Sequence, residues 1–293
     1  MADVGVVHLV REANGLAPLE RFIASYREQP AGHAHELILV CKGFPGRLPA
    51  EYERALEGVA YRTLHVADRG FDLAPYFAAT RRFEHRYFCF LNSFSRPLAA
   101  GWLEILHRCA SAPGVGLVGA TGSYQSFAQS SEERRRLGTR ARLRHVARGG
   151  SPAMVAQRTG AWVLGGLGLW KPARHFPAFP NYHIRTNAFM ASKDVLLRIR
   201  VRPILFKLSA FLLESGRSGL TRQVMAMGLR ALVVDRAGRA FDKESWHLAN
   251  TFRQSRQEDL LVEDNQTVAY EHAQPEERGN LSRIAWGEFA RPA

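Results

Sequence analysis

The sequence has few cysteines, no long apolar run and fewer acidic than basic residues. Its three cysteines, Cys41, Cys89 and Cys109, are too few and too scattered for a disulfide framework or a cysteine zinc site. The longest nearly uncharged apolar stretch, residues 161–170, is about half of what a membrane-spanning helix needs. The N-terminus lacks the basic start and apolar region of a signal peptide, and no Gly-Lys-Ser or Gly-Lys-Thr of a P-loop occurs. We therefore expect a cytoplasmic protein, with peripheral contact to the inner membrane face as the alternative.

Basic residues outnumber acidic ones by 40 to 27, so the formal net charge is +13. Such a field attracts phosphorylated small molecules, an anionic membrane or nucleic acid. Much of the excess lies in residues 132–148, which hold seven arginines, from Arg134 to Arg148, and two glutamates. This segment is either a solvated surface or a contact with an anionic membrane. Because no aromatic platform for stacking bases lies among the arginines, nucleic acid is the less favoured partner.

Short apolar runs alternate with amphipathic stretches over the first part of the chain. Most of these runs are continuous rather than alternating, which is typical of strands that are buried on both faces. The pattern predicts a mostly parallel α/β sheet with helices on both faces. We expect strands at 4–10, 36–41, 61–66, 87–91 and 115–119, and helices at 18–26, 49–57, 73–83 and 99–110.

The second half is less regular. Gly, Ser, Arg and Pro are frequent from residue 120 to 182, which predicts a flexible basic insertion at about 125–180. The length suits a single domain, which we place at 1–270, followed by a C-terminal tail at 271–293. Strands are expected at 183–190 and 231–235, and helices at 193–200, 206–213 and 219–227.

Ligands of parallel α/β sheets bind beyond the carboxyl ends of the strands, so the loops after the strands are the candidate sites. One such loop lies in VADRGFDLAPYFAA, residues 66–79. Gly70 permits a tight turn, and Asp68 and Asp72 can accept hydrogen bonds from a ribose or a base. Alternatively, Asp72 only caps the helix that follows.

A second loop lies in CFLNSFSRPLAAGWLE, residues 89–104, where an apolar strand stops in a polar run. Together with RTNAFMASKDVLL and FLLESGRSGLTRQVMAMG, these two segments resemble, in the same order, glycosyltransferases of the GT-A fold. The similar groups are the family 2-like and rhamnan-synthesis-like enzymes, and the resemblance covers residues 4–125 and 183–270. It implies inverting transfer of a sugar from a nucleotide-sugar donor to a glycan or lipid-linked glycan, in polysaccharide biosynthesis.

The resemblance also implies site residues. The donor would contact a set of residues at the strand ends: Val10, Arg11, Asp68, Gly70, Asp72, Asn92, Ser93, Ser95 and Arg96. Glu214 matches the late carboxylate that removes the proton of the acceptor hydroxyl. Trp162 and Trp170 are candidates for stacking on an acceptor sugar, with core packing as the alternative.

The chain departs from the family where an Asp-x-Asp motif would hold a divalent cation. Asn92, Ser93, Phe94 and Ser95 occupy that place, and neutral oxygens are poor ligands for Mn²⁺ or Mg²⁺. Either a metal is held weakly, with Ser95 and His247 as candidate ligands, or arginine and lysine neutralise the diphosphate. The candidate cations are Arg11, Lys42, Arg69 and Arg96. The degenerate motif also leaves open a non-catalytic nucleotide-sugar-binding protein, and the charge leaves open a nucleic-acid-binding one.

Overall fold

A computed structural model describes residues 2–128, 172–204 and 206–291. Most of the predicted basic insertion lies outside the described residues, including Arg134 to Arg148, Trp162 and Trp170.

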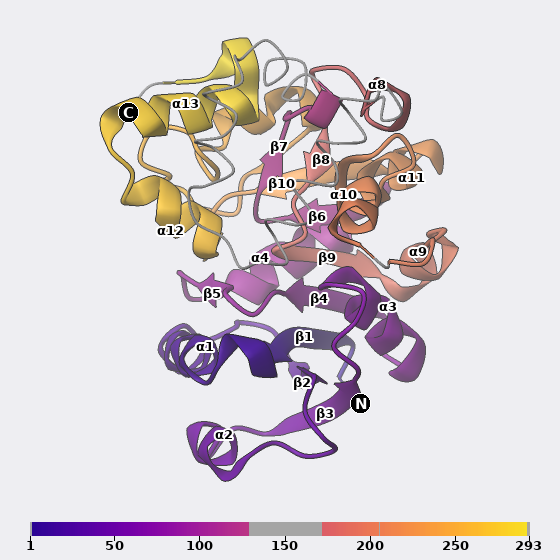
Figure 1. Ribbon diagram of the computed structural model, residues 1–293, viewed down its shortest axis with the longest axis vertical. Coiled ribbons are helices and arrows are strands. Elements are labelled where there is room, and N and C mark those ends of the chain that lie inside the picture. Colours follow the sequence, from indigo (N-terminus) through magenta and orange to yellow (C-terminus); the bar gives the residue numbers. More distant parts are fainter. Residues whose placement is uncertain (1, 129–171, 205, 292–293) are drawn as a thin grey trace.

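An eight-stranded sheet forms the centre of the protein (Figure 1), in the order β11-β10-β6-β9-β4-β1-β2-β3. β9 and β11 run antiparallel to their neighbours and the other six strands are mutually parallel, so the predicted α/β fold with a mostly parallel sheet is confirmed. The strands of this sheet are β1 (Val4–Arg11), β2 (His35–Lys42), β3 (Tyr61–Val66), β4 (Tyr87–Leu91), β6 (Val115–Gly119), β9 (Ala188–Ser192), β10 (Arg230–Val234) and β11 (Ala240–Phe241). Two small pairs lie beside it, β5 (Arg96–Pro97) with β12 (Val262–Glu263) and β7 (Gly122–Ser123) with β8 (His183–Ile184).

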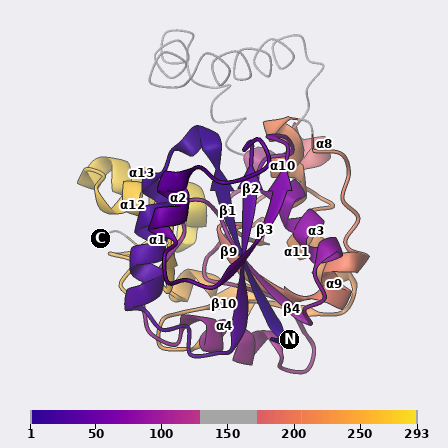
Figure 2. The same cartoon turned by 90° about the horizontal axis from the view of Figure 1, so that it is seen from below.

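Helices cover both faces of the sheet (Figure 2), as the continuous apolar strands predict. One face carries α1 (Ala17–Glu28), α2 (Ala50–Ala55) and α4 (Trp102–Ala110); the other carries α3 (Leu73–Arg82), α9 (Lys193–Arg198), α10 (Lys207–Ser215) and α11 (Leu220–Ala226). The remaining elements are α8 (Pro172–His175), α12 (Asn265–Glu271), α13 (Pro275–Trp286) and the 3-10 turns η1 (Glu12–Asn14), η2 (Lys243–Leu248) and η3 (Gly287–Phe289). Among the described residues, no helix is both long and apolar enough to span a membrane.

Each face of the sheet has its own hydrophobic core. Phe22 and Trp102 pack with Leu39 on one face, and Tyr76 and Phe88 pack on the other, all with at most 1% of their surface exposed. Burying aromatic side chains of this size on both faces is what holds the helices against the strands.

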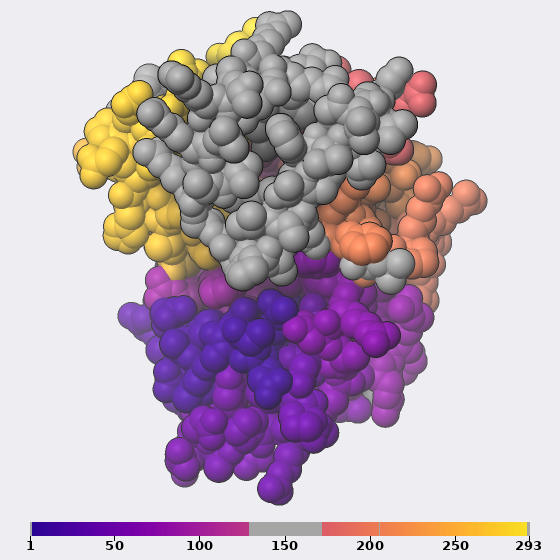
Figure 3. All heavy atoms as spheres, viewed as in Figure 1, coloured from indigo at the N-terminus to yellow at the C-terminus, as the bar shows by residue number. Residues whose placement is uncertain are grey.

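The chain beyond residue 270 belongs to the packed fold, so the boundary predicted there does not coincide with the edge of the core. Trp286 of α13 is buried, and its indole nitrogen donates to the carbonyl of Phe252 at 2.6 Å. The amide of Tyr124 donates to the carbonyl of Ala285 at 2.9 Å. In the space-filling view α12 and α13 (yellow) form the upper left of the surface, above the N-terminal elements (Figure 3).

The single strand predicted at 183–190 is wrong, because residues 185–187 interrupt it between β8 and β9. Their polar groups bind side chains and loops of other elements, as described below, and are therefore not available for a sheet ladder.

His8 makes stability dependent on pH. Its ring stacks on Phe22 with 3.8 Å between centroids, and burial lowers its pKa from 6.5 to about 3. Below pH 6.5 the unfolded chain therefore binds a proton that the folded protein excludes, and stability falls as the pH drops.

We predict that the free energy of unfolding of His8→Phe falls by about 2 kcal/mol less than that of the wild type when the pH drops from 7 to 5. Urea unfolding of both proteins at the two pH values measures this, and His272→Ala, at an exposed histidine, is the control. Equal pH dependence in wild type and His8→Phe would contradict the assignment.

Candidate functional site

A cluster of charged side chains lies at the carboxyl ends of β1, β2 and β3. The Arg11 guanidinium donates two hydrogen bonds to the Asp68 carboxylate, at 2.9 and 2.8 Å. The Lys42 ammonium lies 3.3 Å from Asp68 Oδ1 and donates to the carbonyl of Phe71 at 2.9 Å. Two cations thus share one carboxylate, and the nearby carboxyl group of Asp72 also acts on both of them.

Burial and charge act on these groups in opposite directions. The Lys42 side chain is only 4% exposed, and burial lowers its pKa although Asp68 opposes this. Hydrogen bonds from Arg11 lower the pKa of Asp68. Asp68 therefore stays ionised and holds both cations at the strand ends.

The loop that carries Asp68 is tightly turned. Gly70 and Phe71 both have positive φ, 73° and 51°. A Cβ on Gly70 would lie 2.3 Å from the Cβ of Ala74, so only glycine fits there. A non-glycine residue in the left-handed region is strained, and the bond from Lys42 to its carbonyl helps to hold Phe71 in place.

Asp72 does not act as a helix cap, which was the alternative to ligand binding for this residue. It occupies the N-cap position of α3 but has helical backbone angles (φ −82°, ψ −31°) and makes no capping bond. Burial raises its pKa, and the negative charge of Glu214 raises it further while Lys42 and Arg11 oppose. Asp72 and Glu214 are thus close enough to repel one another across the site.

Glu214 lies in the last turn of α10 and is bound to Thr186. Its Oε1 accepts hydrogen bonds from the Thr186 amide and hydroxyl, both at 3.0 Å. Within the described part of the chain its Oε2 has no hydrogen-bond partner. The same carboxylate acts on the buried ring of His183. Burial lowers the pKa of His183, and the negative charge of Glu214 opposes this decrease.

The residues on either side of Thr186 hold the surrounding loops. Arg185 forms a buried ion pair with Asp264 at 2.8 Å, and Asp264 in turn caps α12. The carbonyl of Asn187 accepts from the Asn92 amide at 3.0 Å and from the Ser95 hydroxyl at 2.6 Å. No pattern in the sequence singles out Arg185 or Asn187, although both lie in the segment RTNAFMASKDVLL.

The polar run after β4 is an internally bonded turn. The Asn92 side chain accepts from the amide of Phe94 at 2.9 Å and from the Ser95 hydroxyl at 3.1 Å. Ser95 is fully buried. The neutral oxygens of Asn92 and Ser95 are thus occupied by protein hydrogen bonds, and no carboxylate belongs to this turn. The turn does not fit the ligand set that Mn²⁺ or Mg²⁺ requires.

Two predicted residues lie in other surroundings. Arg96 is ion-paired with Glu263, where β5 meets β12, so its charge is already compensated. His247 lies among aromatic rings, with Nδ1 3.2 Å from the Tyr124 hydroxyl and the ring 4.6 Å from that of Phe289. Among the described residues, no group of three His, Cys, Asp or Glu side chains suited to a metal includes His247.

Unpaired polar atoms mark the same edge of the sheet. Ser93 Oγ, Asn187 Nδ2 and the Tyr76 hydroxyl are buried without a hydrogen-bond partner in the described part of the chain. Val10, Arg11 and Ser93 meet at the end of β1 around a crevice that is too narrow to admit a water molecule. Since unpaired buried polar groups cost about 1–3 kcal/mol each, they are candidates for satisfaction by a ligand.

Comparisons with known proteins match the fold only. No protein-family model and no curated protein sequence matches the chain. A mannosyltransferase from Pyrobaculum calidifontis, solved with GDP-Man and Mn²⁺, has a TM-score of 0.48 and 13% identity over 85% of this chain and 60% of its own. Glucosyl-3-phosphoglycerate synthase from Mycobacterium tuberculosis was solved with Mn²⁺, UDP and glucosyl-3-phosphoglycerate. It has a TM-score of 0.39 and 15% identity over 77% of this chain and 64% of its own. Residues 1–349 of TarS from S. aureus have a TM-score of 0.32 and 12% identity over 40% of this chain and 34% of their own.

The chain thus spans less than two thirds of the length of the first of these structures. Because all three TM-scores are below 0.5, the likeness says nothing about activity.

Gly70→Ala should destabilise the protein more than a left-handed glycine alone explains. The left-handed backbone costs an alanine about 1–2 kcal/mol, and the clash with Ala74 adds to this. Gly58→Ala is the matched control, because Gly58 has φ 76° and a Cβ there would meet no atom within 4 Å. Denaturant unfolding measures both variants, and equal losses would contradict the described packing of the loop.

Proposed function

We propose that the protein is a glycosyltransferase that moves a sugar from a nucleotide-sugar donor to a hydroxyl of a glycan or lipid-linked glycan. The supporting observation is that the carboxyl edge of the sheet gathers Arg11, Lys42 and Asp68 together with Asp72 and Glu214. Cations for a diphosphate and a carboxylate for a hydroxyl therefore lie at one edge, which is where α/β sheets bind ligands. The resemblance of the sequence to GT-A glycosyltransferases supports the same proposal.

In this proposal Asp68, in the turn around Gly70, contacts the nucleoside, and Arg11 and Lys42 face the diphosphate. Arg11 uses two donors on Asp68 and retains others for phosphate oxygens. Ser93, with its unpaired Oγ, faces the phosphate side, Asn92 and Ser95 hold the turn that carries it, and Arg96 positions that turn through Glu263. No step of the proposal depends on a metal, because the ligand oxygens after β4 do not suit one.

Glu214 is the proposed general base. Thr186 fixes Oε1, so Oε2 is the oxygen that receives the proton of the acceptor hydroxyl. The acceptor oxygen then bonds to the anomeric carbon as the bond from that carbon to the diphosphate breaks. Attack from the face opposite the leaving group inverts the anomeric centre, and the diphosphate leaves toward Arg11 and Lys42.

Glu214→Gln should lower kcat at least about 100-fold, because the amide retains a carbonyl oxygen for Thr186 but cannot take a proton. A thermal-shift screen of UDP, GDP, CDP and dTDP first selects the nucleotide, and turnover is then measured with the corresponding donors. Nucleotide affinity should stay unchanged, and Glu20→Gln, at an exposed glutamate, is the control. Full activity of Glu214→Gln would remove the assignment.

The absence of carboxylates after β4 favours one second candidate, a non-catalytic nucleotide-sugar-binding protein. In that case the wild type would bind a nucleoside diphosphate and show no turnover with any donor.

Arg11→Gln and Lys42→Met should each weaken binding of the selected nucleoside diphosphate about tenfold or more, by removal of a charge-assisted contact. Arg230→Gln is a matched control, because Arg230 binds Asp242 with the same two distances, 2.9 and 2.8 Å, at the other end of the sheet. Calorimetric titration measures the affinities. Unchanged binding in both variants would exclude these cations from the site.

A further inference from the structure

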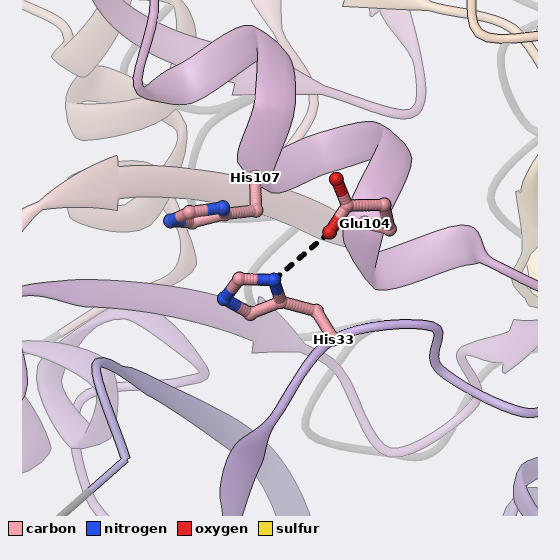
Figure 4. A group of neighbouring side chains, drawn as sticks. All are labelled: His33, Glu104 and His107. Atoms are coloured by element: carbon pink, nitrogen blue, oxygen red, sulfur yellow. Dashed lines mark hydrogen bonds and ion pairs between the residues drawn. The ribbon is translucent and has the colours of Figure 1, made fainter.

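Two histidines and a glutamate meet at the amino edge of the sheet, opposite the candidate site (Figure 4). His33 precedes β2, while Glu104 and His107 lie on α4. The eight residues of β1 separate this edge from Arg11 by roughly 20–25 Å, at about 3.3 Å a residue. The proposed donor site uses none of these three side chains.

The three side chains are close enough to share one ion. One ligand atom from each lies within 4.8 Å of the others. His33 Nδ1 is 2.9 Å from Glu104 Oε2, and the two imidazole rings stack with 4.0 Å between centroids. The carboxylate of Asp3 adds an oxygen 3.8 Å from His107 Nε2.

The backbone builds this cluster rigidly. The chain before His33 docks on the start of α4, where Gly101 N donates to the carbonyl of Pro30 at 2.7 Å and Glu104 N donates to that of Ala31 at 3.1 Å. Gly32 has φ 77°, and a Cβ there would lie 2.8 Å from the Cα of Gly101. Glu104 and His107 are three residues apart on α4 and share a helix face, a spacing that places two metal ligands side by side.

One imidazole nitrogen of the cluster is left without a partner. His107 Nε2 is buried and has no hydrogen-bond partner among the described residues. An unpaired imidazole nitrogen is the atom through which histidine binds a transition metal.

We infer that His33, Glu104 and His107 bind a transition-metal ion of the zinc class, with Asp3 as a fourth oxygen donor. Two imidazoles and the Glu104 carboxylate are a ligand set that suits Zn²⁺, which binds three such side chains together with one further oxygen. The ion would join the loop before β2 to α4 and to the start of β1. It would stabilise the fold at the amino edge of the sheet, remote from the proposed donor site at the carboxyl edge.

Metal binding to the chelator-treated, dialysed full chain tests this. Calorimetric titration with ZnCl₂ should show one saturable site per chain, and Co²⁺ should give the visible absorption of a tetrahedral nitrogen–oxygen site. Zn²⁺ should also raise the melting temperature. Absence of a saturable site, or of the Co²⁺ bands, in the wild type would overturn the inference.

Variants locate the site. His33→Ala and His107→Ala should weaken Zn²⁺ binding at least about 100-fold, and the near-isosteric Glu104→Gln about tenfold or more. His272→Ala, at an exposed histidine, should bind as the wild type does. Circular dichroism checks that each variant is folded. If a histidine variant does not fold, Glu104→Gln still tests the site. Wild-type Zn²⁺ affinity in folded Glu104→Gln and His107→Ala would place the ion elsewhere and overturn the assignment.

Discussion

Three consecutive residues, Arg185, Thr186 and Asn187, connect the two halves of the molecule. Each leaves the sheet ladder to bind a different element: Arg185 the buried carboxylate of Asp264, Thr186 the carboxylate of Glu214, and Asn187 the turn after β4. Because the Arg185–Asp264 pair is buried, removal of either partner would leave an uncompensated charge at a cost of about 3–5 kcal/mol. The positions of Glu214 and of the turn after β4 therefore depend on one interruption between β8 and β9.

The two edges of the sheet carry different chemistry. At the carboxyl edge, Arg11 and Lys42 converge on Asp68, and polar atoms such as Ser93 Oγ and Asn187 Nδ2 are buried without partners in the described residues. That combination suits a polar, anionic ligand. At the amino edge, imidazoles and a carboxylate converge on a docked loop, which suits a soft or borderline cation. One sheet thus separates a proposed reaction site from a proposed stabilising site.

The sequence predicts the parts of this structure that local pattern controls. The apolar runs at 87–91 and 115–119 became β4 and β6 with the same bounds, because burial on both faces leaves no polar position inside them. β3 also has the predicted bounds, 61–66, although it is a partly exposed edge strand that contains Arg62, Thr63 and His65. Apolar pattern does not encode strand direction, so the antiparallel insertion of β9 was not predicted. Long-range pairs were also missed: Arg96 was expected to be a free cation, and Glu263, its partner, lies 167 residues away. Capping of α3 was the alternative role for Asp72, but its carboxyl group interacts with Lys42 and Glu214, which are distant in the sequence.

The central claim is that side-chain cations, rather than a divalent metal, compensate the donor diphosphate. It rests on the turn after β4, which holds no carboxylate and in which the oxygens of Asn92 and Ser95 are occupied by hydrogen bonds, and on the two cations Arg11 and Lys42 beside Asp68. The most direct measurement is calorimetric titration of the wild type with the nucleoside diphosphate, in EDTA and in excess Mn²⁺. We expect dissociation constants that agree within about threefold, a difference below about 0.7 kcal/mol. Loss of binding in EDTA, with recovery in Mn²⁺, would contradict the claim.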